Sequence, residues 1–229
     1  MRINTNVSSL TAQEAAKNTN SSISSSLEKL STGLKINKAS DDASGLAIAD
    51  KLRTQVTSIN QGVANGNSAI TLLQIADKSM AEQSKILDTV KSKLIQANTA
   101  TTSSDGRESI RKDITKLLEQ LDNIAQQTNY NGTYLLQQNA TASAASNTLN
   151  FQVGEKSTDI ISMTGVRANT GGLALTSINA LTSGGLTSAL ASSEQATVDT
   201  AITTLNGYRG DIGSTQNQVE SAVRNLMTQ

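Results

Sequence analysis

Two adjacent aspartates, Asp41 and Asp42, are the residues whose types and spacing most suggest chemistry. A pair of carboxylates can bind a metal ion or take part in acid–base catalysis. The pair also stands directly before an apolar run, where a helix would begin. Ser40 or Asp41 can accept hydrogen bonds from the free N–H groups of a first helical turn, and both acids suit its positive end. We therefore expect Ser40, Asp41 and Asp42 to cap a helix at a joint.

The composition leaves few groups for catalysis or metal binding. The 229 residues include no His, Cys, Pro or Trp. Histidine is the commonest general base and metal ligand, and a chain without Cys has no thiolate site. We expect no enzymatic activity, no metal and no cofactor. Lys plus Arg and Asp plus Glu number 19 each, so a nucleic-acid partner is not indicated. No apolar run predicts a membrane span, and the N-terminus lacks a signal-peptide pattern.

The remaining polar motifs have structural interpretations. Asp105-Gly106 and Asn131-Gly132 are turn signals. Four lysines that alternate with acidic residues predict a solvated face of two helices, although a basic patch is the alternative; they are Lys91, Lys93, Lys112 and Lys116.

Heptad spacing predicts the elements that position these groups. Apolar residues recur every three and four positions over about 43–98, 105–128 and 193–229, which is typical of helices in a coiled-coil-like bundle. The sequence therefore predicts a mainly α fold, a long antiparallel helical rod with a small β-hairpin region. The residues expected to pack the rod are Leu52, Val56, Ile59, Leu73, Leu87, Leu94, Ile114, Leu117, Leu121, Val198, Ile202, Leu205, Val219 and Val223.

Two regions lie outside this pattern. The N-terminal piece has weak apolar stripes and a break at Gly33, so it predicts an amphipathic helix that needs a partner. Between the rods, "NYNGTYLL" predicts a hairpin, and "LNFQVG" and "STDIISM" predict short strands. The Ser-, Thr- and Gly-rich stretches 137–148 and 164–193 predict surface loops or partly disordered segments.

Several motifs resemble bacterial flagellin. They are "MRINTNVSSLTAQ", "LEKLSTGLKINKASDDASGLAIADKLRTQV", "NGNSAITLLQIADKSM" and "QTNYNGTYLL" within 1–136, and "RGDIGSTQNQVESAVRNL" at 209–226. The resemblance implies a secreted, extracellular subunit that self-assembles into the flagellar filament. It also implies contacts with the flagellar export apparatus and with cap and junction proteins. Residues 1–40 would form the filament-core helix and the joint, and 41–229 the rod, with the hairpin and loop region at about 129–192.

The resemblance also assigns the filament contacts and sets the alternative. The core contacts would come from Ile3, Val7, Leu10, Ile23, Leu27, Leu30 and Leu34. In flagellins a further helix follows the last rod and closes the core; this sequence stops at Gln229 without that helix, so we expect a shortened chain or a fragment. A hook–filament junction or adaptor protein is the alternative, but such proteins usually have Pro after the Asp pair, where this chain has Ala43.

One more expectation concerns host recognition. Flagellins detected by the flagellin-sensing Toll-like receptor carry Arg and Leu at the positions that match Thr89 and Lys93. The stretch "ILDTVKSKLIQ" resembles instead flagellins of the Campylobacter and Helicobacter group, which evade that receptor. Weak or no recognition is therefore implied. The positions that match the receptor-contact surface are Asp88, Thr89, Lys93, Ile110, Asp113 and Lys116.

Overall fold

The computed structural model describes residues 6–139 and 144–228. Its elements are α1 (Val7–Thr32), α2 (Ala43–Asn98), α3 (Ser104–Gln127), β1 (Asn129–Tyr130), β2 (Thr133–Tyr134), β3 (Leu149–Gln152), β4 (Ile160–Met163), α4 (Thr176–Asn179) and α5 (Ser188–Leu226). The predicted fold class is confirmed: long antiparallel helices with small β-hairpins. The chain divides into two compact units, Met1–Thr57 and Ser58–Gln229, which are considered separately.

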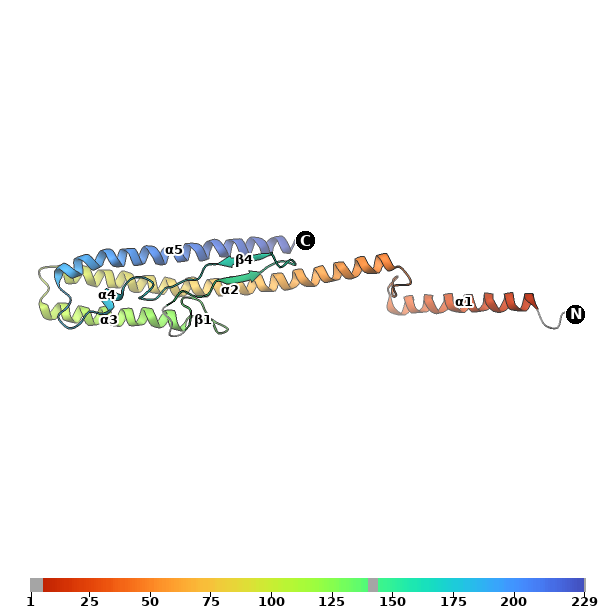
Figure 1. Cartoon of the computed structure of the whole chain (residues 1–229), viewed down its shortest axis with the longest axis horizontal. Helices are drawn as coiled ribbons and strands as arrows, with labels where there is room; N and C mark the ends of the chain where they lie inside the picture. Colours follow the sequence, from red (N-terminus) through yellow and green to blue (C-terminus); the bar gives the residue numbers. More distant parts are fainter. Residues whose placement is uncertain (1–5, 140–143, 229) are drawn as a thin grey trace. The chain divides into compact units, whose positions relative to one another are not determined.

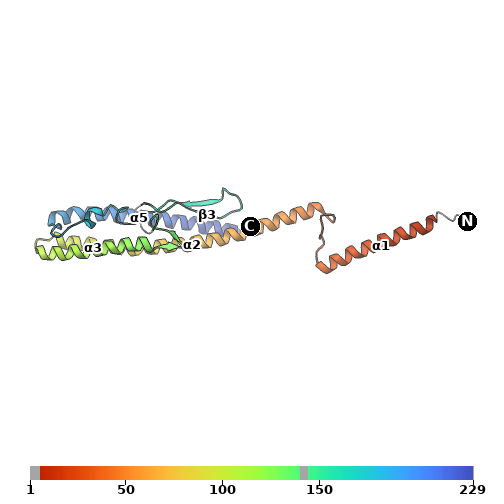
Figure 2. The same cartoon turned by 60° about the horizontal axis from the view of Figure 1, so that its bottom comes forward.

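In the second unit α2 lies side by side with α3 and α5, as Figures 1 and 2 show. Two ion pairs show that α5 runs antiparallel to α2. Lys91 pairs with Asp199, and Arg209, which follows Asp199 in α5, pairs with Asp77, which precedes Lys91 in α2. Lys93 pairs with Asp113 of α3 at 2.9 Å. We call this three-helix bundle the rod.

Most of the apolar residues expected in the rod lie in its core. Nine of the expected side chains are buried: Leu73, Leu87, Leu94, Ile114, Leu121, Val198, Leu205, Val219 and Val223. Ile59, Leu117 and Ile202 are half-buried at its margin.

The expectation for Leu52 and Val56 is wrong in the described chain. Their exposed fractions are 55% and 57%. Helix α5 ends at Leu226, whose side chain lies 3.3 Å from the position a Cβ would take on Gly62. In the first unit these two side chains are therefore not packed into a core, although the heptad pattern continues through them.

One core position of α3 differs from the expected one. Leu118 is fully buried where Leu117 is expected, while Ile114 and Leu121 on either side are buried as predicted. Heptad spacing does not separate adjacent leucines, because either one continues a pattern of threes and fours. The burial of Leu118 shows which of the two faces the bundle.

Small residues form the seam of α2 near the end of α5. A Cβ on Gly66 would lie 2.3 Å from Val223 Cγ2, and one on Gly62 would lie 2.8 Å from the carbonyl oxygen of Val153. The missing side chains let α5 and the chain at Val153 come close to α2. The heptad pattern of apolar residues does not reveal this seam of glycines. It follows Val63 and Ile70, which are only partly buried beside the core.

The hairpin predicted from Asn131-Gly132 is present as β1 and β2. Both turn residues have positive φ, 50° and 81°, as a type I′ turn requires. Strands β3 and β4 form a second antiparallel pair, with Phe151 opposite Ile161. This pair packs along the rod, where β4 contacts α5 and Asn65 of α2 donates to the carbonyl oxygen of Gln152 at 3.1 Å.

The stretch 164–193 is not the surface loop that its composition predicted. It contributes core side chains, among them Leu173, Leu175, Ile178 and Leu186. Polar anchors fix it to the helices: Gln83 Nε2 donates to the carbonyl oxygen of Ala168 at 2.7 Å, and Asp122 accepts from the backbone N–H of Thr170 at 2.8 Å. These partners are far apart in sequence, so no local pattern reveals them.

The loop before α5 is held to α3 by Glu108 and Arg111. The guanidinium of Arg111 donates to the Glu108 carboxylate at 2.7 Å and to the carbonyl oxygen of Leu181 at 3.0 Å. The backbone N–H of Gly184 donates to Glu108 at 3.0 Å. These bonds, that from Arg111 first, lower the pKa of Glu108 from 4.5 to about 2. The carboxylate thus stays ionised well into the acid range.

The register of α3 can be tested with two alanine substitutions. Leu118→Ala removes a fully buried side chain, and we expect it to lower the free energy of unfolding by about 2–5 kcal/mol. Leu117→Ala should cost clearly less, because part of that side chain is already in water. Chemical denaturation followed by circular dichroism measures both. A larger loss for Leu117→Ala would show that the α3 register is wrong.

Candidate functional site

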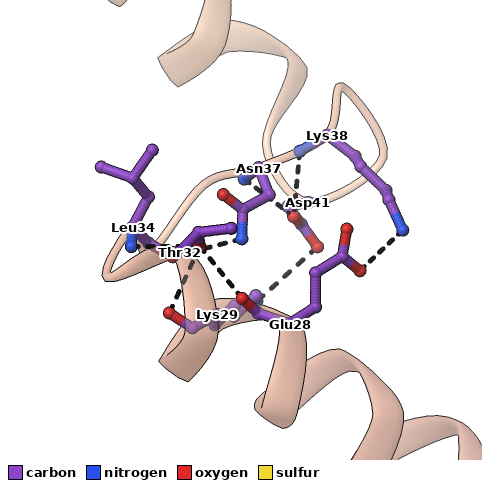
Figure 3. A network of polar contacts seen from close by, with 7 residues as sticks. All are labelled: Glu28, Lys29, Thr32, Leu34, Asn37, Lys38 and Asp41. Atoms are coloured by element: carbon purple, nitrogen blue, oxygen red, sulfur yellow. Dashed lines mark hydrogen bonds and ion pairs between the residues drawn. The ribbon is translucent and has the colours of Figure 1, made fainter.

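In the first unit, the chain between α1 and α2 is closed by a polar network (Figure 3). We call residues 33–42 the joint. Helix α1 ends at Gly33, whose φ of 69° is left-handed, as predicted for a helix C-cap. The Thr32 hydroxyl donates to the carbonyl oxygen of Glu28 at 3.0 Å and accepts from the N–H of Leu34 at 3.3 Å. The chain therefore leaves α1 in a defined direction.

Asp41 organises the middle of the joint. Its Oδ2 accepts from the backbone N–H groups of Asn37 at 3.1 Å and Lys38 at 3.2 Å. Its Oδ1 lies 3.6 Å from the Nζ of Lys29, on the last turn of α1. These partners, the Asn37 N–H first, lower the pKa of Asp41 below its ordinary value of 3.8. The carboxylate thus folds the joint back on itself and faces α1.

Asp42 is the residue that caps α2. Its Oδ1 accepts from the N–H of Gly45 at 2.9 Å, the geometry of an N-cap residue. The expectation that Asp41 also caps α2 is wrong, because both of its oxygens are engaged within the joint and with Lys29. No hydrogen bond of Ser40 to the first turn of α2 is observed among the described residues. The adjacent acids therefore have two different structural roles.

A second ion pair links the joint to α1. Lys38 Nζ lies 2.7 Å from Glu28 Oε2, and this bond raises the pKa of Lys38. The two residues are ten positions apart across a helix break, so no helical spacing rule predicts the pair. Sequence reasoning also missed Gly45, on which a Cβ would lie 2.5 Å from Asp42 Oδ2 and 2.9 Å from the side chain of Ile36. A side chain at this position would require the side chains of Asp42 and Ile36 to move.

The other notable feature of this unit is its exposed apolar side chains. None of the side chains of α1, all of which are described, is buried. The exposed fraction of Leu30 reaches 80%. We use the name apolar face for the set of large exposed hydrophobic residues of this unit, which form two stripes along the N-terminal piece and continue on the first turns of α2: Val7, Leu10, Ile23, Leu27, Leu30, Leu34, Ile48, Leu52 and Val56. Ile3, expected to belong with them, lies outside the described residues.

Such a face is unusual for a chain that stays alone in water. Isolated exposed apolar residues are normal, but an extended series is a feature of interaction surfaces. Fully burying one such side chain is worth about 1.5–3 kcal/mol. The arrangement is suited to association, with the joint fixing how α1 leaves α2.

The positions that match the receptor-contact surface lie on α2 and α3 of the rod. Asp88 and Thr89 are exposed, and Lys93 is engaged with Asp113. Lys116 pairs with Glu119 at 2.6 Å. The expectation for Ile110 is wrong, because its side chain is 6% exposed and faces the rod core. A side chain buried in the rod core is not available to a receptor.

The part of the chain that the structure describes contains no group of three or more acidic, His or Cys residues arranged to hold a metal ion. Among the described helices, none combines the length and the hydropathy needed to span a membrane.

The joint should respond to acid through Asp41. Because its pKa is lowered in the folded chain, its bonds are present above the ordinary value of 3.8 and are lost as the pH falls through the lower, folded value. The NMR shifts of the Asn37 and Lys38 amide protons should therefore move together at a pH below 3.8.

Asp41→Asn is the matched control, since an amide has no charge to lose in this range. In that variant the acid-dependent movement of both amides should disappear. Titration of the two wild-type amides at or above 3.8, or an unchanged response in Asp41→Asn, would contradict the assigned role.

Several known proteins are similar to this chain in sequence. The family described as bacterial flagellin N-terminal helical region matches residues 3–141. Flagellin B of Helicobacter pylori is 48% identical over 153 residues, which cover 67% of this chain and 29% of that protein. The flagellar filament 33 kDa core protein of Treponema phagedenis is 30% identical over 236 residues, covering 97% of this chain and 80% of that protein.

A solved structure shares the fold. The crystal structure of Bacillus cereus flagellin aligns with a TM-score of 0.61 at 27% identity, covering 71% of this chain and 88% of that one. The chain spans less than a third of the length of the Helicobacter pylori flagellin B that it matches.

Proposed function

Because this chain belongs to the bacterial flagellin family, we propose that it acts as a structural subunit of the flagellar filament. In this role the chain has no catalytic activity. It is exported through the flagellar export apparatus, polymerises outside the cell and meets cap and junction proteins at the ends of the filament. Its main partners are further copies of itself.

The apolar face carries this proposal. Side chains such as Leu27 and Leu30 lie on a helix that has no buried residue, and Leu34 follows that helix in the joint with an exposed side chain. In a filament, neighbouring subunits would cover them, and residues 1–40 would supply the core contacts while 41–229 supply the rod. A zero net charge keeps the repulsion between copies low.

Assembly can be tested with charges placed on the apolar face. We expect Leu27→Glu combined with Leu30→Glu to raise the concentration needed for filament growth by about a hundredfold or more, since both side chains lose their burial between subunits. Purified protein is mixed with sheared filament seeds, pelleted and imaged by electron microscopy. The melting temperature of the rod should not change.

Gln13→Glu with Ser24→Glu is the control, because both residues are exposed on α1 and neither belongs to the apolar face. It adds the same two charges to the same helix and should leave growth unaffected. Equal growth of the Leu27/Leu30 variant and this control would contradict the proposal. Wild-type protein that binds the seed ends without lengthening them would indicate a junction or adaptor protein instead.

We further propose weak recognition by the flagellin-sensing Toll-like receptor. The surface offers Thr89 and Lys93 where detected flagellins have Arg and Leu, and Lys93 is already paired with Asp113. An arginine anchor at an interface commonly contributes about 2 kcal/mol or more, roughly thirtyfold in affinity. Both features disfavour binding at this surface.

The receptor proposal predicts a gain of signalling when the two residues are replaced. Thr89→Arg with Lys93→Leu should raise activation in a receptor reporter assay by about tenfold or more. The control is Thr54→Arg with Lys51→Leu, the same types of change at exposed positions elsewhere on α2. No gain, or an equal gain in the control, would count against the proposal.

A further inference from the structure

Three glycines stand inside α5, at Gly207, Gly210 and Gly213. No described heavy atom outside their own helical turns lies within 4 Å of the position a Cβ would take on any of them. This is the reverse of Gly66 in α2, where a Cβ would lie 2.3 Å from Val223. Gly66 is required by the packing of the rod, whereas packing within the described chain does not require the glycines of α5.

Glycine weakens a helix that has no need for it. Each glycine in a helix interior lowers the helix-forming equilibrium about fivefold relative to alanine. Three of them fall within seven residues of α5. Isolated from its packing, this stretch is the weakest part of the helix.

Packing does not compensate for this weakness. The buried residues of α5, a helix that the structure describes over its whole length, follow each other at steps of three or four on both sides of the stretch. Between Leu205 and Ile212 the step is seven. Tyr208 is half-buried there, and Arg209 pairs with Asp77 at 2.8 Å through side chains that are each about a third exposed. Such partly exposed pairs contribute little stability.

We propose that residues 206–213, which we call the glycine segment, are a built-in point of local opening in α5. The helix unwinds or bends there while the turns on either side stay packed against α2. The segment gives the rod a place at which its curvature can change without loss of the core. This property belongs to the rod itself and does not depend on filament assembly.

Hydrogen exchange of the dispersed protein, followed by NMR or mass spectrometry, tests the proposal. Amides of the glycine segment should exchange at least tenfold faster than those of 216–223. The triple variant Gly207→Ala, Gly210→Ala and Gly213→Ala should slow exchange of the segment by about fivefold per substitution. Its melting temperature should not fall, because each Cβ has free space.

Two control variants separate this effect from general changes in stability. Ser192→Ala with Ser221→Ala raises helix propensity at exposed positions of α5 outside the segment, and it should leave exchange of the segment unchanged. Gly66→Ala should instead destabilise the rod, because its Cβ meets Val223.

Two results would overturn the proposal. One is protection of the glycine segment equal to that of 216–223. The other is a triple variant whose segment exchanges as fast as in the wild type. If the triple variant kept wild-type exchange but no longer assembled, the glycines would serve the close approach of a second copy of the chain.

Discussion

The burial of one face of α2 against α3 and α5 is the constraint on which the rest of the rod depends. Between Gly62 and Ala97 this helix contributes a continuous series of buried residues, and the other two helices align antiparallel along it. The seam changes character along its length: leucines fill it near the end of α2, while glycines near its middle let α5 approach closely. The strands and the segment 164–187 pack on this helical frame.

The same helix explains why the first unit differs from the second. The turns of α2 in the first unit keep the apolar spacing of the rod, but the side chains of Leu52 and Val56 are exposed there. Together with α1 they form an apolar face, and the joint fixes the path of the chain between the two helices. A heptad pattern thus predicts an apolar surface suited to burial. It does not say whether the same chain or another one covers that surface.

Patterns of short range were predictable from the sequence. The bounds expected for the longest helix, 43–98, coincide with those of α2, and Asn131-Gly132 forms the predicted hairpin turn. Interactions across the fold were not predictable. The choice of Leu118 over Leu117 depends on where α2 lies, and the order of 164–193 depends on Gln83 and Asp122, both distant in sequence. At the joint, Asp41 was expected to cap a helix, but the two backbone N–H groups of a loop bind it instead.

The central claim is that the rod folds by itself while the apolar face is covered only by association. Hydrogen exchange compared between dispersed protein and assembled filament tests it most directly. The account predicts that amides of α1 and of 43–57 exchange quickly in the dispersed protein and become strongly protected in the filament. Rod amides on the buried seam should be protected in both states. Strong protection of α1 in the dispersed protein, or equally fast exchange of α1 in the filament, would contradict the claim.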